Sequence, residues 1–366
     1  MTNYRQFTAA DWQRIERDWS AWWRGELARP MVVLEVHEPH PGIDWRTFDT
    51  FVTQFGLDVP VDVVLDHLQP SLDALHYFGD AFPKWWVNGG AGIMAAFLGA
   101  RVDHQNGTTW FHEIGVSSLA EFNLAFDPDN AWWQRIYTIT QAAVERWGTD
   151  VTIGMTDLGG NMDILASLRG TQQLLLDLYD MPDEVERLCQ QITALWWQYY
   201  EELDALIQPA GRGSACWGPF WAPARSYMLQ SDFAYMISPE MFERFVLPDL
   251  LALCAKLDYP FYHMDGIGQI RHLDALLAIP NLRGIQWQPG DGQPTADQWL
   301  DLLRRIRDGG KLCQVYVNRE GAYRILRELG GRGFLFHVLD TLEAEPLTLA
   351  EAEAFVEDFQ AEAARQ

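Results

Sequence analysis

Short continuous apolar runs recur along the second half of the chain, each followed by a longer segment with helical spacing. The last four runs begin near residues 261, 283, 311 and 333. Apolar runs without alternating polar residues are typical of parallel strands that are covered on both faces. Repeated strand–helix units in a chain of 366 residues predict a (β/α)8 barrel. A doubly wound open sheet is the alternative, although no Gly-x-Gly-x-x-Gly motif follows an early strand.

The N-terminal part of the chain has a different pattern. Apolar residues at helical spacing, most of them Trp, predict an amphipathic helix over residues 10–27. The run from Met31 to Val36 then predicts a buried strand. No segment has the composition of an interdomain linker. We therefore expect a single domain over residues 1–366, in which residues 1–30 form an N-terminal helical extension.

Composition and charge exclude several classes of partner. The chain has 51 acidic and 27 basic residues and a net charge of −24, which repels phosphate backbones, so we expect no nucleic-acid partner. No apolar run is long enough to span a bilayer, and the first residues lack the apolar core of a signal peptide. The four cysteines have no C-x-x-C spacing and indicate a reducing compartment. We expect a cytoplasmic protein without a membrane partner, and the sequence does not indicate its oligomeric state.

Polar residues follow several predicted strands at the point where each apolar run ends. Active sites of barrel enzymes lie at the carboxyl ends of the strands, so we expect these side chains to converge on one pocket. His263 is the strongest candidate, because it ends a buried aromatic run and has an acid two residues later. The candidates for chemistry are His263, Asp265, Asp157 and His337, and those for substrate binding are Trp217, Tyr227, Gln286, Trp287 and Asp340.

The residue types at these positions suit two kinds of chemistry. Imidazoles with carboxylates bind divalent metals such as zinc. The same groups suit proton transfer without a metal, with a carboxylate orienting the histidine. Some positions also have structural explanations. Asp157 and Asp265 could each cap the helix that follows, and Gln286 could form a hydrogen bond inside the barrel.

Several motifs in the C-terminal two-thirds of the chain resemble the uroporphyrinogen decarboxylase superfamily. They are the segment Gly159 to Gly170, the step Asp180-Met181-Pro182-Asp183-Glu184-Val185, the helix start Ile237-Ser238-Pro239-Glu240-Met241-Phe242, and Tyr262-His263-Met264-Asp265-Gly266 at the place of the family's H-x-C-G. The resemblance implies a (β/α)8 barrel. Through the zinc-dependent methyltransferases of the superfamily, it also implies methyl or other one-carbon transfer to a small organic substrate. These relatives further imply zinc as the cofactor and a corrinoid protein as the partner.

The chain departs from these relatives at residues that bear on activity. The Arg-rich motif that binds porphyrinogen carboxylates is absent, so we do not expect uroporphyrinogen decarboxylation. Asp265 stands where the methyltransferases have their first zinc-binding Cys, and His337 lies near the place of the later one. The resemblance therefore implies a zinc site with His263, Asp265 and His337 as ligands. Asp80 lies where the decarboxylase has its catalytic Asp, which implies an alternative: a metal-free decarboxylase or lyase that uses Asp80 and His263. A second alternative is a protein that only binds a corrinoid protein.

Overall fold

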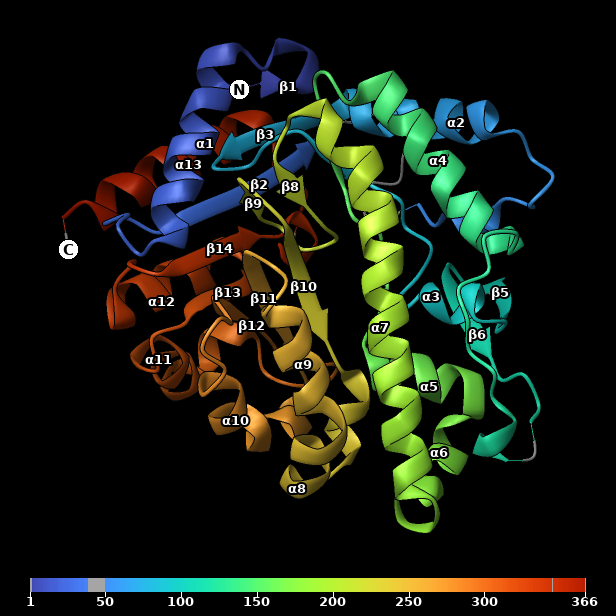
Figure 1. Ribbon diagram of the computed structural model, residues 1–366. Helices are drawn as coiled ribbons and strands as arrows, with labels where there is room; N and C mark the ends of the chain where they lie inside the picture. The colour runs from blue at the N-terminus through green and yellow to red at the C-terminus, as the bar shows by residue number, and fades with distance from the viewer. Residues whose placement is uncertain (1, 39–49, 117, 344, 366) are drawn as a thin grey trace.

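The computed structural model of the chain describes residues 2–38, 50–116, 118–343 and 345–365. The fold is mixed α/β, with strands in the middle and helices around them (Figure 1). Its central sheet has eight strands in the order β1-β3-β2-β14-β13-β12-β11-β10. The six parallel strands of this sheet are β2 (Met31–His37), β14 (Phe334–Val338), β13 (Leu312–Val317), β12 (Gly284–Gln288), β11 (Tyr259–Asp265) and β10 (Ser226–Gln230).

The predicted alternation of strands and helices is confirmed for the C-terminal half of the chain. The helices that connect or follow the last four strands are α10 (Leu273–Leu277), α11 (Leu300–Asp308), α12 (Arg319–Leu329) and α13 (Leu349–Ala363). On α11 and α12 the apolar residues recur every three to four positions, so each helix buries one face against the sheet. The strands are nearly fully buried, because helices cover the outer face of the parallel sheet.

The predicted closure of the sheet into a barrel is not found among the described residues. In a (β/α)8 barrel every strand pairs in parallel with two neighbours. Here β3 (Leu75–Gly79), which we did not predict, pairs antiparallel with β2 and occupies the edge where a further parallel strand would lie. The strand β4 (Lys84–Trp86) pairs instead with β7 (Thr152–Gly154). A single bridge between Met155 and Cys216 then connects β7 to the segment that contains β8 (Ser214–Ala215).

The N-terminal extension packs against the sheet and is not a separate body. It forms α1 (Ala9–Trp23), which begins with a capping box between Thr8 and Asp11. Trp22 stacks on Phe261 near the start of β11, with the ring centroids 6.1 Å apart. The helix therefore covers the amino ends of the parallel strands and leaves their carboxyl ends open for a site.

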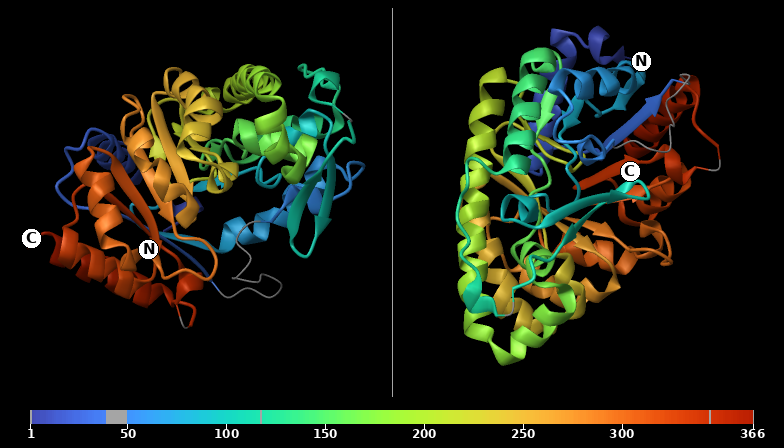
Figure 2. Two further views of the ribbon diagram at one scale, coloured as in Figure 1. Left: turned by 90° about the horizontal axis from the view of Figure 1, so that it is seen from below. Right: turned by 90° about the vertical axis from the view of Figure 1, so that its right-hand side faces the viewer.

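The remaining elements flank this core. In two views α4 (Ala131–Trp147) and α7 (Pro182–Ile207) run side by side (Figures 1 and 2). None of the helices in the described residues combines the length and the hydrophobicity that a membrane crossing requires. The other helices and strands are β1 (Thr2–Asn3), α2 (Val61–Ala74), α3 (Met94–Phe97), β5 (Arg101–Gln105), β6 (Thr108–His112), α5 (Asn161–Arg169), α6 (Thr171–Asp180), β9 (Trp221–Ala222), α8 (Pro239–Met241) and α9 (Leu247–Cys254).

Candidate metal centre

Three side chains at the carboxyl ends of two neighbouring strands come together in the structure. One possible ligand atom from each of Asp232, His263 and Asp265 lies within 4.8 Å of the others. His263 and Asp265 are two residues apart on β11, so both side chains point to the same face of the sheet. Asp232 follows β10, whose last residue Gln230 lies beside His263 in the parallel ladder. The sheet register therefore places the three groups at one point.

The imidazole of His263 is held in a fixed orientation. Its Nδ1 is hydrogen-bonded to the amide oxygen of Gln286, the residue beside it on β12. Because Nδ1 donates this bond, Nε2 is left to face the oxygen Oδ2 of Asp265, 3.7 Å away. Burial lowers the pKa of His263, but the hydrogen bond to Asp265 and the charges of Asp232 and Asp265 outweigh it, so the pKa is raised.

Negative charge is in excess around this imidazole. Burial raises the pKa of Asp157 to about 7, with the charge of Asp232 as a further cause. Burial and the charge of Asp232 also raise the pKa of Asp163 to about 8. Within the described part of the chain, none of these carboxylates, nor that of Asp265, forms an ion pair with Lys or Arg. The raised pKa values mean that Asp157 and Asp163 are partly protonated near neutral pH, which relieves part of this excess, and a cation bound by Asp232 and Asp265 would relieve it further.

Asp163 fixes the position of Asp232. Its two carboxylate oxygens accept hydrogen bonds from the backbone N–H groups of Asp232, at 3.1 Å, and Phe233, at 2.7 Å. Those N–H groups belong to the first turn of a 3₁₀ segment, Asp232–Met236, so the bonds cap its amino end. Asp163 lies in the first turn of α5 and therefore links that helix to the candidate metal ligands.

Two of the three candidate ligands, Asp232 and Asp265, line a cleft that is open to solvent. The cleft has a volume of about 350 Å³, and its lining includes Asp232, Asp265 and the ring of Tyr235. Gly266 directs the chain away from the site with a φ of +82°, and a Cβ there would lie 2.8 Å from the Tyr235 ring. A glycine is needed at this turn for both reasons. A cation held by the three side chains would therefore keep positions free for a substrate.

His337, which we predicted as the third ligand, lies outside this cluster. It belongs to β14, and two strands separate it from His263 in the sheet. Its ring lines a different cavity, and burial lowers its pKa to about 3, with the charge of Lys84 as a second cause. Asp157 lies closer to the cluster. Its Oδ1 accepts a hydrogen bond at 3.3 Å from the side chain of Gln230, the residue beside His263 in the parallel ladder.

The residues predicted to bind substrate are divided between the two faces of the sheet. Gln286 contacts His263, and the ring of Trp217 lies edge-on to the His263 ring at 5.2 Å between centroids. Tyr227 lies on the other face, where its ring packs on α7 and its hydroxyl accepts the backbone N–H of Leu158. Trp287 is fully buried and contacts Trp299. The prediction for Asp340 concerns a side chain outside the described part of the structure.

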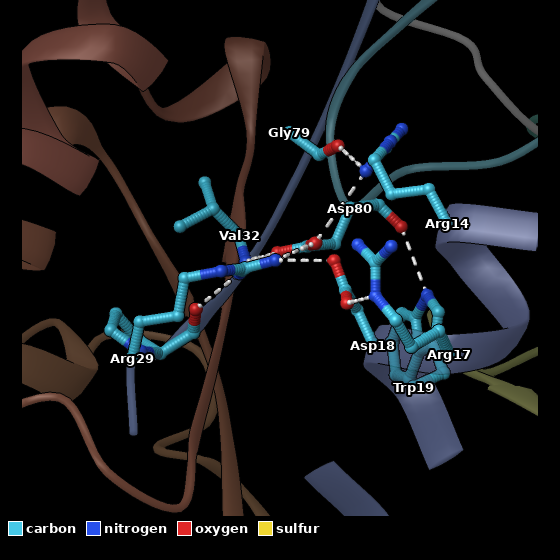
Figure 3. Close-up of polar contacts among 9 residues, drawn as sticks. Arg14, Arg17, Asp18, Trp19, Arg29, Val32, Gly79 and Asp80 are labelled. Carbon is cyan, nitrogen blue, oxygen red and sulfur yellow. Dashed lines mark hydrogen bonds and ion pairs between the residues drawn. The ribbon is translucent and has the colours of Figure 1, made fainter. Parts of the chain in front are cut away.

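Asp80 is also not brought to the site. It is fully buried at the amino ends of the strands, where its carboxylate accepts the backbone N–H of Val32 at 2.9 Å (Figure 3). Both oxygens also accept bonds from the guanidinium of Arg29, at 2.7 and 2.8 Å. Val32 is the second residue of β2, whereas Asp265 is the last of β11. Asp80 and His263 therefore lie at opposite ends of the parallel sheet.

Asp232 is the site residue that we did not predict from the sequence. It follows the strand β10, which is buried over its whole length. We assigned no strand to this segment, so the acid that follows it was not considered. A signal was present, since Gln230, Ser231 and Asp232 directly follow the short apolar run from Tyr227 to Leu229.

Comparisons with known proteins do not assign a family. No family model matches the chain, and a search of curated proteins finds no match. A solved structure that it resembles is a B12-independent methionine synthase from Shewanella sp. W3-18-1 in complex with selenomethionine. The two share 13% sequence identity over 74% of this chain and 75% of the other, with a TM-score of 0.41. A similarity at this level carries no argument about activity.

Proposed function

We propose that this protein is an enzyme that binds a divalent cation, zinc in the first place, through His263, Asp265 and Asp232. We propose further that it transfers a methyl or other one-carbon group to or from a small organic substrate. The convergence of the three ligand atoms within 4.8 Å at an open cleft carries the metal part of this proposal. The sequence resemblance at Tyr262 to Gly266 supports the choice of reaction.

The donor set fits zinc. A neutral imidazole and two carboxylates are common zinc ligands, and three protein ligands with an open position are typical of catalytic sites. Zinc bound there would supply a Lewis acid for a polar group of the substrate. Carboxylates are harder ligands than thiolates, so we expect an oxygen or nitrogen group of the substrate at the open position in place of a thiol.

The chain's own residues have distinct tasks in this proposal. Gln286 holds the ring of His263 so that Nε2 faces the carboxylates, which is the usual role of an outer hydrogen-bond partner. Trp217 covers the side of the same ring and limits the access of water. Asp157, with a pKa of about 7, can accept or release a proton near neutral pH and lies one hydrogen bond from Gln230.

The metal-free decarboxylase that would use Asp80 and His263 lacks geometric support, because those residues lie at opposite ends of the sheet. Metal-free acid–base chemistry with Asp157 and His263 remains the competing proposal, since Asp157 titrates near pH 7 and the charge of His263 acts on it. Binding to a corrinoid protein stays a prediction from the resemblance.

Metal analysis distinguishes these proposals. We expect about one zinc per chain in wild-type protein produced with zinc in the medium, and a near-complete loss of it in His263→Ala. The exposed His67, on α2, supplies the matched control, and His67→Ala should retain the metal. Wild-type protein that takes up no divalent metal yet converts substrate would refute the metal proposal and favour the acid–base alternative.

A further inference from the structure

A second and larger cavity lies at the carboxyl ends of the strands, and its lining includes Trp217, whose ring contacts that of His263. It has a volume of about 550 Å³, which suits a small organic molecule. It shares no lining residue with the cleft of the candidate metal centre. Much of its wall is aromatic and would suit a planar apolar group, through Phe51, Trp85, Trp86, Trp217 and Tyr316.

Lys84 places a positive charge in this aromatic cavity. Its ammonium donates hydrogen bonds to the carbonyl oxygens of Gly218, at 2.7 Å, and Cys216, at 3.3 Å. It forms no ion pair with a carboxylate in the described part of the chain. Glu35 also lines the cavity, and its side chain or backbone interacts with another group. In a protein of net charge −24, a lysine that faces a cavity without a carboxylate partner is an unusual feature.

Two ring nitrogens of the cavity wall are not exposed in the cavity. The indole Nε1 of Trp217 and the ring Nδ1 of His337 are both buried, and the Trp217 indole lies close enough to the Tyr227 hydroxyl to act on it through a hydrogen bond. The ammonium of Lys84 is therefore the group on which recognition of a polar ligand depends here. Lys84 is near enough to His337 for its charge to act on that ring.

We propose that this cavity binds a carboxylate-bearing, planar small molecule, with the carboxylate held by the ammonium of Lys84. The planar body would lie between the aromatic side chains of the wall. The binding of this ligand does not depend on the proposed function. The statement that the ligand is the substrate rests on it. Because Trp217 also contacts the ring of His263, a molecule held there lies beside a candidate metal ligand.

Benzoate is a suitable probe, and benzamide is its neutral counterpart. Binding is measured by titration calorimetry with full-length protein treated with a chelator, so that a metal cannot bind the carboxylate. We expect saturable benzoate binding to the wild type and much weaker binding of benzamide. Lys84→Met should weaken benzoate binding at least tenfold, because a charge-assisted hydrogen bond is lost. Lys84→Gln, which keeps a hydrogen-bond donor and removes the charge, should weaken it several-fold.

Equal affinity of benzoate for the wild type and for Lys84→Met would overturn the proposal, as would wild-type protein without saturable benzoate binding. The thermal midpoint of each variant is measured first. If Lys84→Met does not fold, Lys84→Gln alone decides, and unchanged benzoate affinity in that variant contradicts the proposal. Zinc content is determined separately, so the two proposals can fail independently. A protein that takes up no zinc but binds benzoate would refute the metal part of the proposed function and support this inference.

Discussion

Replacement of Asp80 by Ala tests whether this residue stabilises the fold. The carboxylate is fully buried and receives two hydrogen bonds from Arg29 and one from the backbone of Val32 (Figure 3). In Asp80→Ala the guanidinium of Arg29 would keep only Asp18, at 3.0 Å, as a counter-charge. We therefore expect a large loss of stability without a direct effect on the candidate metal centre.

The size of the loss follows from the burial of the pair. Removing one partner of a buried ion pair costs about 3–5 kcal/mol. Because the side chain of Arg29 is 25% exposed, we expect a value near the lower end of that range. Unfolding entropies of about 2.1 cal/mol/K per residue give about 0.8 kcal/mol/K for 366 residues. The expected decrease in the thermal midpoint is then roughly 4 °C.

Differential scanning calorimetry of purified variants measures this decrease. Asp301→Ala, which removes a highly exposed ion pair with Arg304, is the control and should change the midpoint little. The double variant Arg29→Met, Asp80→Leu should be more stable than Asp80→Ala, because it leaves no unpaired buried charge. An Asp80→Ala protein with the wild-type midpoint would refute this reasoning. If that protein were also inactive, Asp80 would have a role in catalysis.

Two further predictions concern stability against pH and the geometry of the cleft. Burial raises the pKa of Asp249 to about 7, whereas an unfolded Asp titrates near pH 4. The folded state therefore keeps a proton that the unfolded state releases. As a result, the free energy of unfolding falls as pH rises from about 4 to about 7. Asp249→Asn should therefore raise the thermal midpoint at pH 8 and change it little at pH 5. At the cleft, Gly266→Ala would combine a φ of +82° with a contact of 2.8 Å to Tyr235 and should weaken zinc binding at least tenfold in competition with a chelator. Gly292→Ala, with a φ of +73° and no atom within 4 Å of the added Cβ, is its control and should bind zinc as the wild type does.

Local patterns in the sequence were sufficient for the C-terminal strands and helices. The helix α12 is one example, because its apolar spacing and its boundaries are local signals. The strand β10 was missed because its apolar part is only three residues long, from Tyr227 to Leu229, which is too short to indicate a strand by itself. With that strand missed, Asp232 was missed too.

The assignment of residues to the site depended on the strand order and the register of the sheet, which local patterns in the sequence do not specify. Gln286 and Trp287 are adjacent on one strand, and alternation allows only one of them to face His263. Both were predicted to face the pocket, and the sheet register selects Gln286. The antiparallel pairing of β3 with β2 places Asp80 at the amino ends of the strands. His337 was grouped with His263 because both end apolar runs, but the strand order places β12 and β13 between them.

The central claim is that His263, Asp265 and Asp232 bind one metal ion. Crystals of the zinc-loaded protein, measured on both sides of the zinc absorption edge, test it directly through the anomalous difference map. We predict one peak about 2.0–2.2 Å from Nε2 of His263 and from a carboxylate oxygen of Asp265 and of Asp232. A zinc peak held by His337, or a fully loaded protein with no peak at these three side chains, would contradict the account.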